Sequence, residues 1–354
     1  MGLLIVFKDN QKKQYLCKQP KQTELKMKRL IPILAGLFAG IMPAFAQMLP
    51  DSTVQVVAYW ELGDKQKYQV ESTKYRIAQG DTTIVEKSSE ILAFEVVADD
   101  EEKGYRLKVT SLETQYSDPT KEAIEEAILK QRGAGAYYFE TGPNGEFLRV
   151  LPIEGLEEQQ EALAQAVWEA VKEKRPEAAQ LNMLPLIRQT LTPEAVVMTA
   201  TGLISPLFMY HGNRFDMDDE YPIEDEIPAV IGGGTMKMAG TFWVDEDMTD
   251  EYSVVLRMYK EADPKQLKPL LGAIMDTLVQ SLSSTPEDAD EAQAAVNEAL
   301  LTAKMTVEDY LYEEIHLGSG WPIDWSFSRE VFIDIDGEQQ SQLVESNIRI
   351  IVEE

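Results

Sequence analysis

Long runs of alternating apolar and polar side chains are the feature that most constrains the fold of this chain. Four such runs lie within residues 53–116, the first carrying Val54 to Leu62, and more follow between residues 236 and 352. A period of two residues places apolar side chains on one face of a strand and polar ones on the other. Strands with one wet face typically pair antiparallel. The sequence therefore predicts a large antiparallel sheet.

Helical periodicity separates the strand runs. Asp118 and Pro119 are predicted to cap and begin one helix, and Thr192 and Pro193 another, because a side-chain acceptor followed by proline suits a helix N-terminus. One face of the segment 264–282 carries only large aliphatic side chains, which is typical of an amphipathic helix: Leu267, Leu270, Leu271, Ile274, Leu278 and Leu282. Helices or helical segments are predicted over 119–130, 156–174, 180–190, 193–210, 264–282 and 285–304.

Strands that occur in runs, rather than in strict alternation with helices, are typical of the α+β class. We predict a curved antiparallel sheet of about eleven strands, half-barrel-like, with helices packed on one concave face. Residues 47–354 are expected to form a single domain, because no long Pro, Gly or Ser linker divides them. The acidic run 216–226 is predicted to be a loop, and a split near 212–226 is the alternative.

An export signal is predicted at residues 27–46. Met27-Lys28-Arg29 precede an apolar run, and Ala44 and Ala46 are the small residues that a signal peptidase requires, so cleavage is expected between Ala46 and Gln47. A spanning helix needs about 20 apolar residues and tolerates this run's two prolines poorly. Residues 1–26 are interpreted as an upstream extension. The product is expected in the periplasm or outside the cell, with no lipobox and no membrane anchor.

Composition excludes several function classes. The formal net charge of −28 repels nucleic-acid phosphates and anionic head groups, so neither nucleic acid nor an anionic membrane is an expected partner. The single cysteine, Cys17, precedes the signal, which leaves no disulfide and no thiol nucleophile in the exported part. We expect a monomer without cofactors.

No catalytic or metal motif is complete. His211 and His316 are the two histidines, and no G-x-S-x-G nucleophile motif accompanies them. Residues 216–226 lack the glycine and the final glutamate of an EF-hand, although calcium binding of another kind stays open. Gly232 to Gly234 are interpreted as a loop, since the P-loop spacing is missing. Many carboxylates are present, but no motif singles out a pair.

Apolar side chains crowd into residues 181–210, where methionines add adaptable surface for a lipid-like ligand. An ordinary core under the sheet is the alternative reading. The side chains predicted to line an apolar site, here and in the 264–282 helix, are Met183, Leu184, Ile187, Val197, Met198, Leu207, Phe208, Met209, Leu271, Ile274 and Leu278.

Two stretches carry a resemblance. Residues 137–142 and 145–150 (YYFETG and GEFLRV), and residues 320–327 (GWPIDWSF) before an Asp-Gly hairpin, resemble segments of uncharacterised exported proteins of Bacteroidota over most of 50–352. The strand count and inserted helices are also similar to the periplasmic lipoprotein-carrier (LolA-like) half-barrel. That resemblance implies a curved sheet, lidded by helices, that holds acyl chains. It carries over no catalytic residue.

The sequence therefore predicts a non-enzymatic exported protein that binds an apolar, lipid-like ligand or a protein partner between sheet and helices. A structural or envelope-interaction protein with a filled core is the first alternative. A carboxylate-dependent hydrolase is the second. An apolar cavity, a solid core or a cleft with convergent carboxylates would distinguish the three.

Overall fold

The computed structural model describes residues 52–352 apart from 134, 181–182, 218, 229–234, 246–251, 283–292, 295, 297, 299–301 and 336. The chain divides into two units, Met1–Ala46 and Gln47–Glu354, and every described residue belongs to the second. The predicted signal peptide, the glycine run 232–234 and most of the helix predicted over 285–304 therefore lie outside the described residues.

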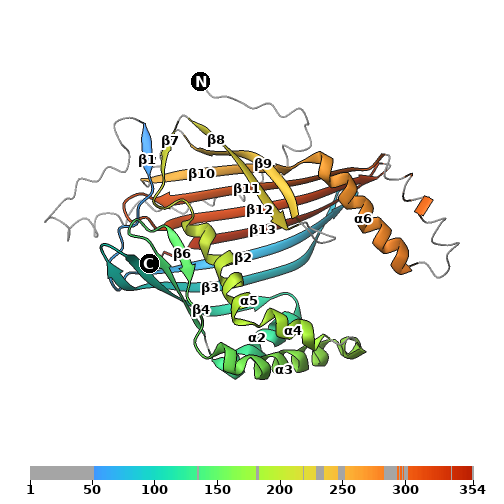
Figure 1. Cartoon of the computed structure of the whole chain (residues 1–354), viewed down its shortest axis with the longest axis horizontal. Helices are drawn as coiled ribbons and strands as arrows, with labels where there is room; N and C mark the ends of the chain where they lie inside the picture. The colour runs from blue at the N-terminus through green and yellow to red at the C-terminus, as the bar shows by residue number, and fades with distance from the viewer. Residues whose placement is uncertain are drawn as a thin grey trace. The chain divides into compact units, whose positions relative to one another are not determined.

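Eleven strands form one open, curved antiparallel sheet, which confirms the predicted α+β class (Figure 1). The order across the sheet is β6-β5-β4-β3-β2-β13-β12-β11-β10-β9-β8, so the first and second halves of the chain meet where β2 pairs with β13. The strands are β2 (Lys65–Ala78), β3 (Asp81–Asp100), β4 (Gly104–Tyr116), β5 (Ala136–Thr141), β6 (Phe147–Val150), β8 (Glu220–Pro228), β9 (Thr235–Val244), β10 (Ser253–Ala262), β11 (Lys304–His316), β12 (Pro322–Ile335) and β13 (Glu338–Ile350).

The described helices begin where the sequence indicates. Asp118 accepts a hydrogen bond from the Thr120 N–H at 2.8 Å, and Thr192 accepts one from the Ala195 N–H at 3.2 Å, so both predicted caps are confirmed. The helices are α2 (Pro119–Arg132), α3 (Leu156–Lys174), η2 (Pro176–Gln180), α4 (Leu184–Thr190), α5 (Pro193–Ile204), η3 (Ser205–Phe208) and α6 (Pro264–Leu282).

Helices α2, α5, η3 and α6 pack on the same face of the sheet, here called the inner face. Phe208 of η3 contacts the rings of Phe94 and Phe139, which project from β3 and β5. Leu267 and Leu271 of α6 pack on Met236 and Met238 of β9. Figure 1 shows α5 lying across the strands, with α6 toward the end where β11 begins.

The first predicted strand, 53–62, is only partly correct. Strand β1 (Thr53–Gln55) pairs with β7 (Arg214–Asp216) in a separate two-stranded sheet. Beyond it the chain stays extended, and Val54, Val56, Ala58 and Trp60 are all buried in the core, whereas Leu62 is exposed. The segment threads through the core instead of joining the large sheet. The alternation of apolar and polar residues predicted which of its side chains are buried, but it does not indicate which strand, if any, the segment pairs with.

The acidic run 216–226 is not a loop, contrary to prediction. Residues 220–228 form β8, which pairs with β9 at one edge of the large sheet. Tyr221 and Ile223 pack on the core, and this burial outweighs the low strand propensity of the acidic residues between them. Charged side chains and prolines on an edge strand also discourage pairing with another chain.

Backbone approaches backbone closely at Gly320, which precedes β12. Its φ is +74°, and a Cβ atom there would lie 2.4 Å from the Val57 oxygen and 2.7 Å from the Ala58 Cα. The neighbouring Ser319 carbonyl accepts a hydrogen bond from the Tyr59 N–H at 3.1 Å. Glycine at this position therefore lets the threaded segment 56–60 lie against the 317–321 turn.

Replacing Gly320 with alanine should lower the free energy of unfolding far more than replacing Gly337. Both glycines have positive φ, but nothing lies within 4 Å of a Cβ built at Gly337. Gly337→Ala should lower the free energy of unfolding by about 1–2 kcal/mol, because alanine is strained in a left-handed backbone conformation. Gly320→Ala should lower it by the same amount plus the cost of the clash between the new Cβ and the segment 56–60. Urea unfolding of both variants measures the difference. Equal losses would contradict the close packing at Gly320.

Candidate functional site

The structure divides the predicted apolar site between two clusters on the inner face. Leu207 and Phe208 are fully buried in a large first cluster with Phe94 and Phe139, and Val197 packs against it. Leu271 belongs to a smaller second cluster with Met236. Met183, Leu184 and Ile187 are half-buried, whereas Met198 and Met209 are exposed; the side chains of Ile274 and Leu278 lie outside the described residues.

A row of charged side chains separates the two clusters. Lys260, Asp309 and Arg329 lie opposite one another on β10, β11 and β12. Arg329 donates two hydrogen bonds of 2.7 Å to the buried carboxylate of Asp309, and the Lys260 ammonium lies 3.0 Å from Asp225 on β8. The hydrogen bond from Lys260 lowers the pKa of Asp225. The inner face is therefore not one continuous apolar groove.

A carboxyl group without partners lies inside the first cluster. Glu313 on β11 is fully buried, and neither of its carboxyl oxygens has a hydrogen-bond partner among the described residues. Burial raises its pKa well above the usual value for glutamate, because desolvation disfavours the charged form. Trp325, directly opposite on β12, has an indole N–H that is equally unpartnered.

Two tyrosines complete the surroundings of Glu313. Tyr68 on β2 is fully buried and donates a hydrogen bond to the Pro322 carbonyl at 3.0 Å. Tyr210, just after η3, is nearly as buried and stacks on Phe242 with ring centroids 4.8 Å apart. Burial raises the pKa of both hydroxyls, and the nearby Glu313 carboxyl raises them further. Four polar side chains thus meet in an aromatic interior.

His211 links three parts of the same core. Its Nε2 lies 2.7 Å from the Gly320 carbonyl, and its ring contacts Trp60 and Phe208. Burial lowers its pKa to about 4, so the ring is neutral at physiological pH and Nε2–H donates the hydrogen bond. His316 instead contacts the Ser319 hydroxyl, 2.9 Å from Nδ1, in the adjacent turn. The two histidines therefore support packing and a turn.

Two carboxyl groups approach each other beneath α2. Glu90 projects from the inner face of β3, and Glu125 projects from α2. Burial raises the pKa of each, and the charge of Glu125 raises that of Glu90 further. The pKa of the Tyr116 hydroxyl is raised to about 12, mainly by burial and further by the negative charges of Glu125 and Glu90. A hydrolase with paired carboxylates, the second alternative from the sequence, would require such an arrangement of two carboxyl groups.

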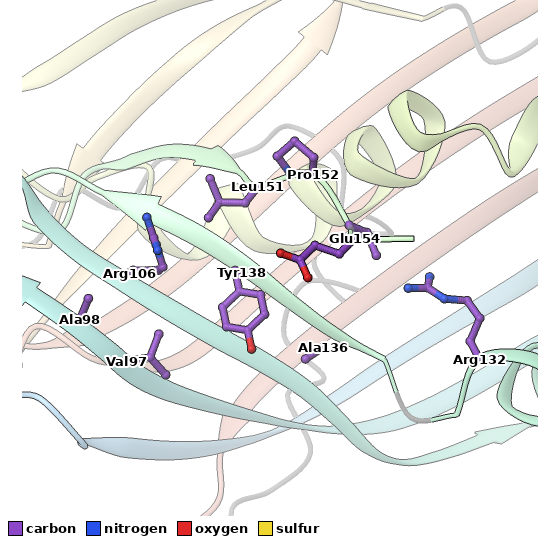
Figure 2. A pocket seen from close by; sticks show the side chains of 10 residues that line it. Val97, Ala98, Arg106, Arg132, Ala136, Tyr138, Leu151, Pro152 and Glu154 are labelled. Atoms are coloured by element: carbon purple, nitrogen blue, oxygen red, sulfur yellow. The ribbon is translucent and has the colours of Figure 1, made fainter. Parts of the chain in front are cut away.

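Two cavities in the described part of the chain lie outside the first apolar cluster, and one of them reaches the second cluster at Met238 and Ala262. One of about 420 Å³ is lined by Arg106, Arg132, Tyr138 and Glu154 among others, and Figure 2 shows Tyr138 between the two arginines. Another of about 720 Å³ lies near β8 and is lined largely by acidic side chains, Glu224 and Glu261 among them. None of the predicted apolar lining residues that the structure describes contributes to either cavity.

Three strongly exposed apolar side chains lie on α4, on α5 and directly after η3. The exposed fractions are 71% for Met198, 51% for Leu186 and 51% for Met209. In the described part of the chain, no single helix is long and apolar enough to cross a membrane. Leu184–Thr190 and Pro193–Phe208 reach that length and composition only as a pair, bent by 59°. The same segment that fills the core with Leu207 and Phe208 thus presents apolar side chains outward.

Comparison of the sequence with protein-family models and with curated proteins finds no match in either. Within the ranges that the structure describes, no three His, Cys, Asp or Glu side chains are grouped to hold a metal ion. The assignment of a site therefore rests on the chain's own geometry.

Sequence reasoning missed Glu313. The two-residue period of β11 would have revealed it, because every second side chain of this strand faces the core, including Met305, Val307, Leu311 and Ile315. Asp309 and Glu313 occupy that same buried phase. An acidic residue at a core position of a strand is expensive and indicates either an ion pair or a special role. Asp309 has the ion pair, and Glu313 does not.

Replacing Glu313 with leucine should stabilise the protein at pH 7 by about 1–3 kcal/mol, because an unsatisfied buried polar group is removed. In the folded wild type the raised pKa lets the Glu313 carboxyl keep its proton, whereas in the unfolded chain an ordinary glutamate loses it above about pH 4.3. The free energy of unfolding should therefore fall as the pH rises from about 4.3 toward the pKa of Glu313 in the folded protein. Glu313→Gln should abolish this dependence. Urea unfolding at pH 5 and 8 measures it, with exposed Glu338→Leu as the control. An unchanged pH dependence in Glu313→Gln would contradict the assignment.

His211 should impose the opposite pH dependence. Its pKa is about 4 in the folded protein against 6.5 as the ordinary value, so its contribution is complete above pH 6.5 and is lost as pH falls toward 4. The loss over this window should be roughly 3 kcal/mol. Unfolding of wild type and His211→Gln between pH 7 and pH 4 isolates this contribution as the difference in slope. Parallel curves would show that His211 is not buried and neutral.

Proposed function

We propose that this chain is an exported, non-enzymatic binding protein that holds an apolar, lipid-like ligand between the inner face of its sheet and the α4–α5 segment. The observation that carries this proposal is the exposure of Met198, Leu186 and Met209 along a segment whose Ile204, Leu207 and Phe208 are buried in the core. Exposed apolar side chains that recur along a segment, here on α4, on α5 and directly after η3, are typical of interaction surfaces. The flexible thioethers of methionine adapt to irregular apolar partners.

The shape of the sheet supports the same function. Toward their middle, β2 and β13 carry only half-buried or exposed residues on the inner face, such as Val70, Ser72 and Ser346. An open sheet with uncovered inner surface beside an apolar helical segment offers room for an alkyl chain. The eleven-stranded open sheet with helices on one face is also the arrangement that the lipoprotein-carrier resemblance implies.

A protein partner is the second candidate. The first cluster is densely filled with stacked rings, such as Trp60 on Trp321 with centroids 4.6 Å apart. A filled core favours an envelope-interaction protein, in which α4 and α5 would contact another protein instead of a lipid. The same exposed side chains would then form the interface.

Lipid carriage predicts that the protein, purified from its own cell envelope, carries a bound lipid detectable by native mass spectrometry and by solvent extraction. The purified protein should also bind the apolar dye Nile red. Leu186→Glu and Met198→Glu should each weaken dye binding roughly tenfold, because a charge replaces apolar contact. Leu62→Glu, at a site 67% exposed outside this segment, is the matched control and should leave binding unchanged.

Absence of both bound lipid and dye binding in the wild type would refute carriage. In that case, loss of a co-purifying protein in Met198→Glu but not in Leu62→Glu would favour the interaction protein. Equal effects of all three substitutions on dye binding would show that the α4–α5 surface is not the site.

A further inference from the structure

The polar side chains around Glu313 form a cluster that the apolar core does not need. Glu313 and Trp325 lie opposite each other on β11 and β12 and point to the inner face. The hydroxyls of Tyr68 and Tyr210 are close enough for the Glu313 carboxyl to act on their pKa values. Side chains from three strands and from the turn after η3 therefore converge at one place.

Three polar atoms of this cluster lack partners among the described residues: both carboxyl oxygens of Glu313 and Nε1 of Trp325. All four side chains belong to residues that are more than nine-tenths buried. Buried polar groups in native proteins are almost always hydrogen-bonded, and each exception needs an explanation. Leucine and phenylalanine at these two positions would fill the space without that energetic cost.

We propose that Glu313 and Trp325 anchor the polar head of the apolar ligand, and that this head is uncharged and both donates and accepts hydrogen bonds, as a primary amide does. This inference rests on the proposed function. The head's carbonyl accepts from the Trp325 N–H, and its N–H donates to a Glu313 oxygen. The alkyl tail extends from there along the apolar side chains of α5.

The charges around the site select against an ionised head. Neither carboxyl oxygen of Glu313 is hydrogen-bonded to a lysine or arginine among the described residues, so the site shows no cation in place for an anionic head. Lys260 and Arg329 are on the same face but are already paired with Asp225 and Asp309. An ammonium head would pair with Glu313 yet leave the Trp325 N–H without an acceptor.

Tyr210 controls access to the anchor. It directly follows the exposed Met209, and its ring stacks on Phe242 of β9. The neighbouring strand β10 carries Leu256, which lies opposite Glu313. The short segment that carries Tyr210 is bounded by Pro206, where α5 ends and η3 begins, and by Gly212, whose φ is +78°. Entry of the head takes place by displacement of this short segment from the sheet.

Displacement of Nile red at pH 7 by three ligands with the same tail tests the anchor: decanamide, decanoate and decylammonium. Decanamide should displace the dye at a roughly tenfold lower concentration than the two ions, as one hydrogen-bonded head group is worth about that factor. Glu313→Leu and Trp325→Phe should each raise the decanamide concentration required roughly tenfold. Trp325→Phe should leave the other two ligands unchanged, whereas Glu313→Leu should leave decanoate unchanged and weaken decylammonium, which loses its carboxyl partner. Glu313→Gln, which keeps a donor and an acceptor, should behave as the wild type.

The outcomes separate this inference from the proposed function. If the wild type binds Nile red but all three ligands displace it equally, the anchor is wrong and the apolar site stands. If decylammonium is the strongest competitor, the site binds cations and the uncharged head is wrong. If the wild type binds no dye, the proposed function fails and the anchor fails with it. Should Glu313→Leu not fold, Trp325→Phe and Glu313→Gln decide between the same outcomes.

Discussion

The antiparallel pairing of β2 with β13 is the interaction on which the rest of the structure depends. Residues 68–78 pair in continuous register with residues 340–350, so a strand near the beginning of the domain lies beside the last one. Without this pairing the chain would form two separate meanders, β2 to β6 and β8 to β13, each with an unpaired edge. Tyr68 reinforces the pairing by reaching across β13 to donate a hydrogen bond to the Pro322 carbonyl at 3.0 Å. The helical segment between the two meanders then has one continuous inner face to cover.

That inner face combines strong apolar packing with two buried acidic side chains in different surroundings. Asp309 has a two-bonded arginine partner, which compensates for the loss of its hydration. Glu313, four residues along the same strand, has no such partner, and burial in an aromatic interior raises its pKa. Asp309 therefore belongs to a structural ion pair that separates the two apolar clusters, whereas the presence of Glu313 in the core needs another reason. The binding of a polar head group that we propose would supply that reason.

Local pattern was enough to predict much of the fold and little of the site. The caps at Asp118 and Thr192, the long helix at 156–174 and the hairpin of β5 and β6 follow from residues close together in the sequence. Tertiary burial overrode local propensity at β8, where Tyr221 and Ile223 hold an acidic segment in the sheet. The apolar residues chosen for a single site separated into two clusters, because Lys260 and Arg329 interrupt the inner face in a way that helix and strand patterns do not reveal.

The sequence by itself determined the α+β class, the antiparallel pairing and, in the strands that it predicted, most of the apolar side chains that face inward, since periodicity records burial directly. It also determined the strongly acidic character of the chain. Only the tertiary structure decided which strands are neighbours, that residues 56–60 thread through the core, and that Glu313, Trp325, Tyr68 and Tyr210 meet. Such contacts join residues far apart in the sequence, such as Tyr68 and Pro322 at a separation of 254 positions, and their formation depends on loop closure and on the burial of whole faces. No local pattern records either of these.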